Sequence, residues 1–457
     1  MTEILKMLVL TKDDELLRRI RKIVLSLKTT VDGVKKINDV RAKIFRNMID
    51  VLIVSSDSYK KDEVDQFMDE LGMIMSKSPT TQVLLLMNPE DFETGLQSLM
   101  DLDFYQYAKL PVSDTELTLL LETAIERIPL VRMKPPEELN ANSDRLGKLV
   151  GTSAKMQKIY RQLHQAAGTE VNILLLGETG TGKDLAAQTI HQLSDRSDEP
   201  FVPINLGAIP PDLVASELFG HTKGAFTGAV KETRGIFEKA EKGMVFLDEI
   251  EAIDERIQIS LLRLIEQRKF QKLGGKEDVL NRARLIASSN ENLQELIANG
   301  TFRKDLYYRL DVFHITMPPL RENPEDIPLL VNEFLSKDNR KYNSNIKGIS
   351  SECLRSFKKF DWPGNVRELK NVIQRAAIVC EGDEIQMEHL PPRFRNVTDK
   401  KSDTTVTFEV GTPLAKVEKE MILKALSVSN NNRTKAAELL GISRRAIYNK
   451  LKKHNIK

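Results

Sequence analysis

Short apolar runs alternate with longer amphipathic stretches along the first 128 residues of the chain. The runs Met7–Leu10, Val51–Val54 and Val83–Leu86 have the length and composition of buried β-strands. Strands that alternate with helical stretches favour a parallel sheet with helices on both faces. We therefore expect a doubly wound α/β domain over residues 1–128.

The same alternation returns later in the chain and predicts a second, larger α/β domain. Its clearest strands are Val171–Leu176, Met244–Asp248 and Ala283–Ser288. Polar segments without apolar periodicity flank this domain, and the last block has helical patterning only. The expected organisation is a domain at 1–128, a linker at 129–145, the larger domain at 146–393, a linker at 394–410 and a helical domain at 411–457.

Composition fits a soluble protein, since the 457 residues suffice for roughly two to four domains. The net charge is only +2, so the composition as a whole does not indicate a nucleic-acid binder. Cys353 and Cys380 are the only cysteines, which argues against a disulfide framework or a cysteine-rich metal site. The apolar stretch Ile4–Leu10 is too short to cross a membrane and lacks a signal-peptide cleavage pattern. We expect a cytoplasmic protein without a membrane partner.

A glycine-rich loop follows the strand Val171–Leu176 and precedes a helical stretch. Glycines let backbone N–H groups approach phosphates, the helix N-terminus favours anions, and Lys183 can reach the β- and γ-phosphates. The position that usually carries Ser or Thr for Mg²⁺ is Asp184, so a strict P-loop pattern is not met. A glycine-rich turn without nucleotide is the alternative. The residues assigned to ATP are Gly177, Glu178, Thr179, Gly180, Thr181, Gly182, Lys183 and Asp184.

Two later strands of this domain end in polar side chains. The strand Met244–Asp248 ends in paired carboxylates, where Asp248 can hold Mg²⁺ and Glu249 can orient or deprotonate the attacking water. The strand Ala283–Ser288 is followed by Ser289 and Asn290. Together with the glycine-rich loop, these residues predict ATP hydrolysis with Mg²⁺.

Between these elements one phenylalanine stands among glycines and other small residues. Glycine costs about 1 kcal/mol in a helix interior, so such a segment is poor helix material. It suits the tip of a mobile loop that presents an apolar side chain to a partner, whereas the alternative is a tight turn with a buried Phe226. The segment comprises Gly224, Ala225, Phe226, Thr227, Gly228 and Ala229.

These six residues match the GAFTGA signature of bacterial enhancer-binding proteins, the NtrC family, which activate RNA polymerase carrying the sigma-54 factor. The chain resembles that family from about Leu146 to Pro392. An acidic residue after the P-loop lysine is also usual there, so Asp184 fits the resemblance. The resemblance implies an AAA+ ATPase with a helical lid, which assembles from dimers into a hexameric ring and drives promoter opening by moving the loop against sigma-54.

The resemblance also assigns roles to two asparagines. Asn290 takes the sensor I position, which contacts the γ-phosphate or the attacking water. Asn205 matches the asparagine that pairs with the glutamate equivalent to Glu249 and couples nucleotide state to the loop. Without the resemblance, Asn205 would be an ordinary polar residue at a strand end.

Three arginines acquire roles in the same way. Arg303 and Arg309 correspond to arginine fingers that reach the nucleotide of a neighbouring subunit, and such fingers raise hydrolysis about 10³–10⁵-fold. The alternative is a surface helix whose arginines pair with Asp305 or Glu322. Arg367, within Trp-Pro-Gly-Asn-Val-Arg-Glu-Leu, corresponds to sensor II, which contacts bound nucleotide; a plain helix start is the alternative.

The last block is basic, because residues 411–457 carry eleven Lys and Arg against three Glu, a net charge of +8. A helix start at Thr434, a turn at Gly441 and a cap at Ser443 resemble a Fis-type helix-turn-helix whose second helix enters the major groove. Such domains bind paired half-sites as dimers, so double-stranded enhancer DNA is the expected partner; a solvated basic face is the alternative. The candidate DNA contacts are Thr434, Ser443, Arg444, Arg445, Asn449 and Lys450. The candidate core residues are Leu439, Leu440, Ile442, Ile447 and Leu451.

Residues 1–128 resemble the receiver domain of a two-component response regulator, with Asp13 and Asp14 at its Mg²⁺-binding acidic pair. The phosphoacceptor position is Ser55, however, and the hydroxyl residue of the next strand is Met87. The lysine expected directly before Pro111 is also displaced, because Leu110 stands there and Lys109 precedes it. We therefore expect a pseudo-receiver without aspartyl-phosphate chemistry.

Asp57 is the alternative phosphoacceptor, but an offset of two residues along a strand shifts its reach by about 6.6 Å. We expect the pseudo-receiver to control oligomerisation in response to a partner protein, a small ligand or protein abundance. Some flagellar regulators of the family bind cyclic di-GMP, but Gly147 stands where their arginine is expected. The rival interpretations are a DNA-binding repressor or scaffold with a decayed ATPase, and an AAA+ remodeller of the protease or chaperone class.

Overall fold

The computed structural model describes residues 4–25, 29–46, 48–59, 64–78, 80–88, 105–132, 143–342, 345–395, 414–429, 433–442, 446–447, 450–451 and 454. They belong to two compact units, one drawn from residues 1–330 and 362–369, the other from 331–361 and 370–457. Among the helices of the described residues, none is both long enough and apolar enough to cross a bilayer.

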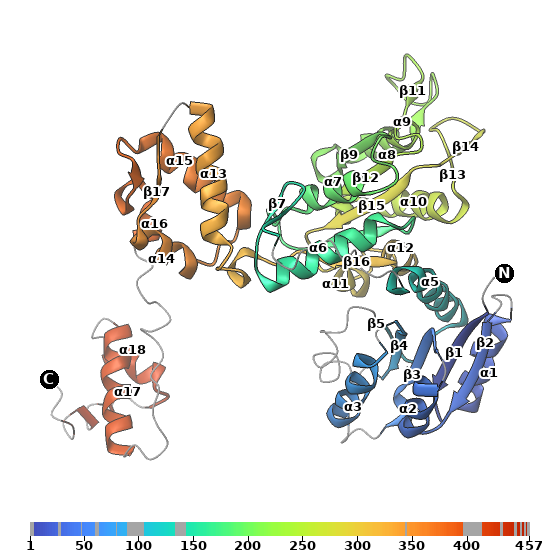
Figure 1. Cartoon of the computed structure of the whole chain (residues 1–457), viewed down its shortest axis with the longest axis horizontal. Coiled ribbons are helices and arrows are strands. Elements are labelled where there is room, and N and C mark those ends of the chain that lie inside the picture. Colours follow the sequence, from blue (N-terminus) through green and yellow to red (C-terminus); the bar gives the residue numbers. More distant parts are fainter. Residues whose placement is uncertain are drawn as a thin grey trace. The chain divides into compact units, whose positions relative to one another are not determined.

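The N-terminal domain is the expected doubly wound α/β fold (Figure 1). Its strands are β1 (Leu5–Leu10), β2 (Thr29–Val34), β3 (Val51–Ser55), β4 (Gln82–Met87) and β5 (Tyr105–Lys109). Its described helices are α1 (Asp14–Val24), α2 (Ile37–Arg46), α3 (Val64–Ser76) and α5 (Asp114–Arg132). All strand pairs are parallel, in the order β2-β1-β3-β4-β5. This order is that of flavodoxin-like domains.

Alternate residues of each strand supply the two cores of this domain, as a parallel sheet covered on both faces requires. Leu8 and Leu52 pack with α2 and α3, whereas Met7 and Val51 pack with α1 and α5. The three predicted strands are confirmed as β1, β3 and β4. Helix α5 continues to Arg132, into the segment assigned to a linker.

The second domain is built on a five-stranded parallel sheet of order β16-β8-β15-β12-β9. These strands are β8 (Ile173–Leu176), β9 (Phe201–Asn205), β12 (Met244–Asp248), β15 (Arg284–Ser289) and β16 (Phe313–Thr316). Its longer helices are α6 (Ala154–Ala167), α7 (Lys183–Leu193), α8 (Pro211–Phe219) and α10 (Glu255–Gln267). Helices α6 and α7 pack on one face of the sheet, and α8 and α10 pack on the other.

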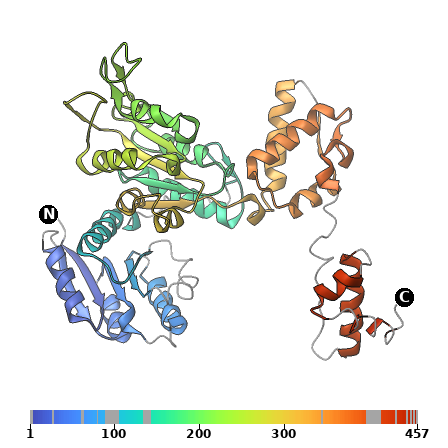
Figure 2. The same ribbon diagram turned by 180° about the vertical axis from the view of Figure 1, so that it is seen from behind.

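Shorter elements complete this domain and carry its loops (Figures 1 and 2). The short helices are α9 (Ile236–Lys239), α11 (Leu293–Ala298) and α12 (Lys304–Leu310). The short strand pairs are β6 (Arg145–Leu146) with β7 (Leu149–Val150), β10 (Gly220–His221) with β11 (Thr233–Arg234), and β13 (Lys269–Gln271) with β14 (Asp278–Leu280). Both of the last two pairs are antiparallel.

The remaining elements are mainly helical. They are α13 (Ile327–Tyr342), α14 (Ser351–Lys359), α15 (Asn365–Val379), α16 (Pro392–Arg395), and the strands β17 (Gly348–Ile349) and β18 (Glu384–Ile385). The terminal domain contains α17 (Leu414–Val428) and α18 (Arg433–Leu439), and residues 446–447 and 450–451 are also helical.

The terminal domain has a small core of its own. The predicted core residues Ile447 and Leu451 are buried, and Leu440 and Ile442 pack against the core. The prediction for Leu439 is wrong, because 62% of this residue is exposed. Ala436 and Ala437 of α18, and Leu440 directly after it, face the core, so Leu439 falls outside that apolar stripe.

Candidate functional site

Three neighbouring strands bring the predicted nucleotide residues to one edge of the second sheet. Strand β15 lies between β8 and β12 and is parallel to both. The glycine-rich loop follows β8, Glu249 follows β12 and Asn290 follows β15. Ligands of open parallel sheets bind outside the carboxyl ends of the strands, which is where these residues meet.

The loop after β8 has a backbone that only glycine readily adopts. Gly177, Gly180 and Gly182 have φ values of 141°, 82° and 96°. A Cβ atom on Gly177 would lie 2.7 Å from the carbonyl oxygen of Met317. The loop runs directly into the N-terminus of α7, so backbone N–H groups and the helix dipole are available to phosphates. This cradle fits the triphosphate of a nucleotide.

Lys183 begins α7, and its ammonium group returns to the loop. Its Nζ donates to the carbonyl oxygen of Gly177 at 2.6 Å and to the side chain of Asn290. Only 5% of Lys183 is exposed. Burial lowers the pKa of Lys183, while the carboxylates of Asp248 and Glu249 oppose that shift. The cation therefore lies between the phosphate cradle and the acidic strand end.

The structure corrects the expected partner of Asn205. Its Nδ2 donates to Oδ2 of Asp248 at 3.1 Å, whereas Glu249 accepts from Nδ2 of Asn290 at 3.2 Å. Asn205 and Asp248 are paired residues of the adjacent strands β9 and β12, so their side chains are brought together by register. Asn290, the candidate sensor I residue, contacts both Lys183 and Glu249.

The site contains two residues that the sequence interpretation did not assign. The buried hydroxyl of Ser288 donates to Asp248, and Glu251 accepts from the backbone N–H of Asn290 at 3.0 Å. Glu249 itself has a left-handed backbone with φ of 58°, a strained conformation that is common at functional sites. Among the described residues no group of three or more His, Cys, Asp or Glu side chains could hold a metal ion, but Mg²⁺ at nucleotide sites needs only one or two carboxylates besides phosphates and waters, which Asp248 and Glu249 could supply.

Both candidate arginine fingers form ion pairs within the chain. Arg303 lies 2.7 Å from Asp305 and 3.3 Å from Glu255. Hydrogen bonding to Asp305 raises the pKa of Arg303. The expected alternative pair with Asp305 therefore exists, whereas Glu322 pairs with Lys155.

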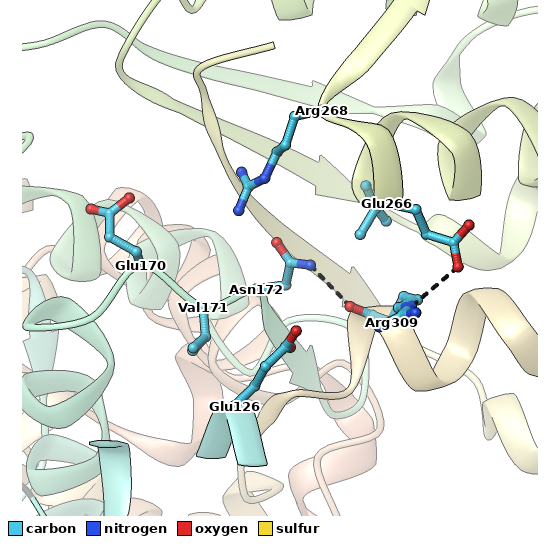
Figure 3. Close-up of a pocket in the computed structure, with 8 residues that line it drawn as sticks. Glu126, Glu170, Val171, Asn172, Glu266, Arg268 and Arg309 are labelled. Atoms are coloured by element: carbon cyan, nitrogen blue, oxygen red, sulfur yellow. Dashed lines mark hydrogen bonds and ion pairs between the residues drawn. The ribbon is translucent and has the colours of Figure 1, made fainter. Parts of the chain in front are cut away.

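Arg309 pairs across the boundary between the first two domains. Its guanidinium group lies 2.8 Å from Glu122 of α5 and 3.2 Å from Glu266 of α10. A cavity of about 370 Å³ adjoins it, and none of the assigned ATP residues lines this cavity (Figure 3). Its lining residues are Glu126, Glu170, Val171, Asn172, Ile265, Glu266, Arg268 and Arg309.

The contact between α5 and α12 is anchored by Arg127. This side chain is buried and donates to the backbone carbonyls of Asp311 and Val312. It also lies 3.4 Å from the carboxylate of Asp311. Tyr308 of α12 packs into the N-terminal core, and its hydroxyl donates to Glu116 at 3.1 Å. We call these contacts of α5 with α12 and with residues 311–312 the seam.

Arg367 lies at the start of α15, beside the glycine-rich loop. Its backbone N–H donates to the carbonyl oxygen of Gly180 at 3.3 Å. Its positive charge is close enough to Lys183 to contribute to the lowered pKa of that lysine. The structure therefore brings the candidate sensor II residue to the nucleotide cradle.

The GAFTGA segment forms a tight turn whose phenylalanine is not buried, since 40% of Phe226 is exposed. The N–H of Gly224 donates to Ala229 at 2.9 Å and closes the turn. Gly224 and Gly228 have positive φ, and a Cβ on either would meet open space. The ring of Phe226 makes an edge contact with His221 at 5.0 Å between centroids.

A second hairpin, β13–β14, supports the base of this turn. The N–H of Thr222 donates to the carbonyl oxygen of Leu273 at 3.0 Å. Lys272 pairs with Glu232 at 2.7 Å and with Glu238 at 2.9 Å. Hydrogen bonds to these carboxylates raise the pKa of Lys272. The turn is therefore open at its tip and fixed at its base.

Most candidate DNA contacts lie outside the described residues, namely Ser443, Arg444, Arg445 and Asn449. Thr434 is within α18, but its side chain is not described. Lys450 is described, and its ammonium group pairs with Glu418 of α17. This ion pair joins Lys450 to α17 within the terminal domain.

The N-terminal domain places Ser55, Met87 and Lys109 at the ends of β3, β4 and β5, as the sequence predicts. Asp57 follows in a short turn and is held by the loop after β1. Its carboxylate accepts from Oγ1 of Thr11 at 3.0 Å and from the N–H of Asp13 at 2.8 Å. It also accepts from the N–H of Lys12. The candidate acceptor is thus engaged by neutral donors.

Family comparisons match the chain in three consecutive segments. These are the sigma-54 interaction domain at residues 149–316, the AAA+ ATPase lid domain at 321–407 and the bacterial regulatory protein, Fis family, at 413–454. The first contains the P-loop, the acidic strand end and the GAFTGA turn.

Curated relatives span most of the chain. Regulatory protein AtoC of Escherichia coli (strain K12) is 36% identical over 391 residues, which are 84% of this chain and 85% of AtoC. Nitrogen fixation protein AnfA of Azotobacter vinelandii is 38% identical over 365 residues, with 77% of this chain and 68% of AnfA covered. The crystal structure of NtrX from Brucella abortus in complex with ATP is 25% identical, with a TM-score of 0.51 and 99% of each chain covered.

Proposed function

The chain belongs to the NtrC family of sigma-54-dependent transcriptional activators, and we propose that it opens promoters by moving residues 224–229 against sigma-54 as ATP is hydrolysed. One observation carries this proposal: Phe226 is exposed on a turn whose base is fixed to the ATPase domain through Thr222 and Lys272. A displacement of that base would move the apolar tip.

ATP binding follows from the AAA+ domain, and we assign individual roles to its residues. The loop at 177–183 holds the phosphates, and Asp248 holds Mg²⁺, which would neutralise phosphate charge when bound. Glu249 orients or deprotonates the attacking water, and Asn290 fixes that carboxylate. Arg367 approaches the nucleotide from the start of α15.

The active form is a ring of subunits, expected to be a hexamer that assembles from dimers. In it, Arg303 and Arg309 of one subunit stabilise charge on the nucleotide of the next. Both arginines pair within the chain here, and Arg309 pairs with the N-terminal domain. Ring formation therefore requires Arg309 to exchange Glu122 for a neighbouring nucleotide.

The N-terminal domain consequently represses the ATPase through the seam. Release does not use aspartyl phosphate, because Ser55 occupies the acceptor position and Asp57 is engaged by the loop after β1. A protein partner or a small ligand that separates α5 from α12 would free Arg309. The cavity beside Arg309 gives such a ligand access to the seam (Figure 3).

The terminal domain anchors the activator to enhancer DNA as a dimer. The Fis-family match and the basic charge of residues 411–457 support this role, because phosphate contacts require clustered Lys and Arg. A repressor or scaffold with a decayed ATPase is less consistent with the hydrogen-bonded set of Lys183, Asn290 and Glu249.

Open-complex formation tests the proposal. Purified chain, sigma-54 polymerase and promoter DNA are incubated with ATP or with a non-hydrolysable analogue. Open complexes should form with ATP only. Open complexes of equal yield with the analogue would overturn the coupling to hydrolysis.

A further inference from the structure

The turn that starts α15 contains a buried asparagine with no assigned role. Asn365 is fully buried, and its backbone φ is 51°. Trp362, three residues earlier, is also fully buried with φ of 49°. Left-handed residues other than glycine persist only where the surroundings fix them. Two such residues in one turn therefore mark a segment that is held in place.

The side chain of Asn365 makes three hydrogen bonds, and both N–H groups of its amide are used. Its Oδ1 accepts from the N–H of Leu320 at 2.8 Å. Its Nδ2 donates to Oε2 of Glu178 and to the carbonyl oxygen of Thr179, both at 3.1 Å. Two of the three partners belong to the glycine-rich phosphate loop.

The backbone of the same turn also contacts that loop. The N–H groups of Val366 and Arg367 donate to the carbonyl oxygen of Gly180 at 3.0 and 3.3 Å. A Cβ on Gly180 would lie 2.4 Å from the carbonyl oxygen of Gly364, so the two backbones meet without space for a side chain. The phosphate loop and the start of α15 are therefore one connected structure.

Glu178 extends this connection to a third segment. Its carboxylate accepts two hydrogen bonds from Arg321, at 2.8 and 2.6 Å, besides the one from Asn365. These bonds, with that from Arg321 the largest, lower the pKa of Glu178. The carboxylate is thus held as an anion between Arg321 and Asn365.

We infer that Asn365 is a positioning residue for ATP hydrolysis, which joins the phosphate loop to α15 so that occupancy of the loop is transmitted to the turn at Trp362. The inference concerns the ATPase alone and does not depend on the contact with sigma-54. An oxygen in place of Nδ2 would be repelled by the carboxylate of Glu178 and by the carbonyl oxygen of Thr179. The loop and the helix would then separate.

Trp362 provides a direct readout, because it is the only tryptophan of the chain. Titration of the full chain with Mg²⁺ and ADP should change tryptophan emission in the wild type. Asn365→Gly keeps a backbone that tolerates positive φ and removes the amide, and Asn365→Asp keeps the shape but loses the donors. At saturating ADP, both variants should lose most of the emission change, and the KM for ATP should rise about tenfold.

Two controls separate coupling from general destabilisation. Asn339→Asp alters a half-buried asparagine that bonds Ile346 instead of the loop, and it should leave the emission change and KM as in the wild type. Glu178→Gln added to Asn365→Asp supplies a donor opposite the new carboxylate and should recover part of both. A wild type without any emission change would overturn the inference. Asn365 variants with the same emission change and KM as Asn339→Asp would also overturn it. The same holds if Glu178→Gln restores neither the emission change nor the KM of Asn365→Asp.

Discussion

The carboxylate of Glu122 lies 2.8 Å from the guanidinium group of Arg309 within one chain. Glu122 belongs to the N-terminal domain, whereas Arg309 is a candidate finger for the nucleotide of a neighbouring subunit. One side chain cannot serve both partners at once. In the proposed ring, the N-terminal domain and the neighbouring subunit would compete for Arg309.

Glu122→Gln should weaken the seam and raise the basal ATPase rate. Partly exposed ion pairs contribute about 0.2–1 kcal/mol, so the increase should be at most about fivefold. The ATPase rate and the ring fraction are measured together at several protein concentrations. Glu15→Gln, on the exposed start of α1, is the matched control. Equal ATPase rates for both variants would show that Glu122 does not restrain the ATPase.

Arg127→Met should open the seam more completely. The side chain of Arg127 is buried with backbone carbonyl partners, and breaking a buried charge pair costs about 3–5 kcal/mol. Asp311 keeps its contact with His314 at 2.8 Å and the hydrogen bond from the hydroxyl of Tyr307 at 2.8 Å, so its carboxylate retains two partners. Hydrogen exchange of α12 and the ATPase rate should both increase.

The control for that variant is Arg19→Met, which breaks the pair with Asp114 inside the N-terminal domain. It should leave exchange in α12 unchanged. If Arg127→Met also leaves α12 protected, the seam does not restrain the ATPase.

Asn290→Ala should impair hydrolysis more than Asn205→Ala. Asn290 contacts both Lys183 and Glu249, whereas Asn205 contacts Asp248. Loss of a positioned donor in an active site costs about 10²-fold or more in kcat. Steady-state ATPase assays with both variants at saturating ATP give the comparison. The reverse order would show that Asn205 controls Glu249 through a rearrangement.

Asp57→Ala should destabilise the N-terminal domain instead of abolishing a phosphorylation. The carboxylate accepts hydrogen bonds from Thr11 and from the N–H groups of Lys12 and Asp13. Thr11 is buried, and a buried donor left without a partner costs about 1–3 kcal/mol, whereas the N–H groups of the exposed residues Lys12 and Asp13 can bond to water. Hydrogen exchange across residues 4–25 should therefore increase. If acetyl phosphate labelled the wild type and Asp57→Ala abolished that labelling, the domain would be a working receiver.

The sequence predicted the placement of candidate residues that lie close together in the chain. The phosphate loop, the acidic end of β12 and the GAFTGA turn are each continuous segments. Lys183 and Asp248 come near enough to interact electrostatically because parallel strands end at one edge of the sheet. The sequence could not predict that Asn205 hydrogen-bonds Asp248 instead of Glu249, because this contact depends on the register between β9 and β12.

Contacts between segments that are distant in the chain could not be predicted from the sequence pattern either. Arg127 and Asp311 are separated by 184 residues, and nothing in the helical period of α5 indicates which buried carbonyls its arginine will meet. The exposure of Leu439 has a similar cause, since one position on a short helix decides between core and solvent.

Open-complex formation by Phe226→Ala tests the central claim most directly. Phe226 is exposed and distant from the nucleotide residues along the chain, so the variant should keep the wild-type ATPase rate. Loss of an aromatic anchor at an interface costs 2 kcal/mol or more, so the yield of open complexes should fall more than about thirtyfold. An unchanged yield of open complexes at an unchanged ATPase rate would contradict the proposed action of the loop on sigma-54.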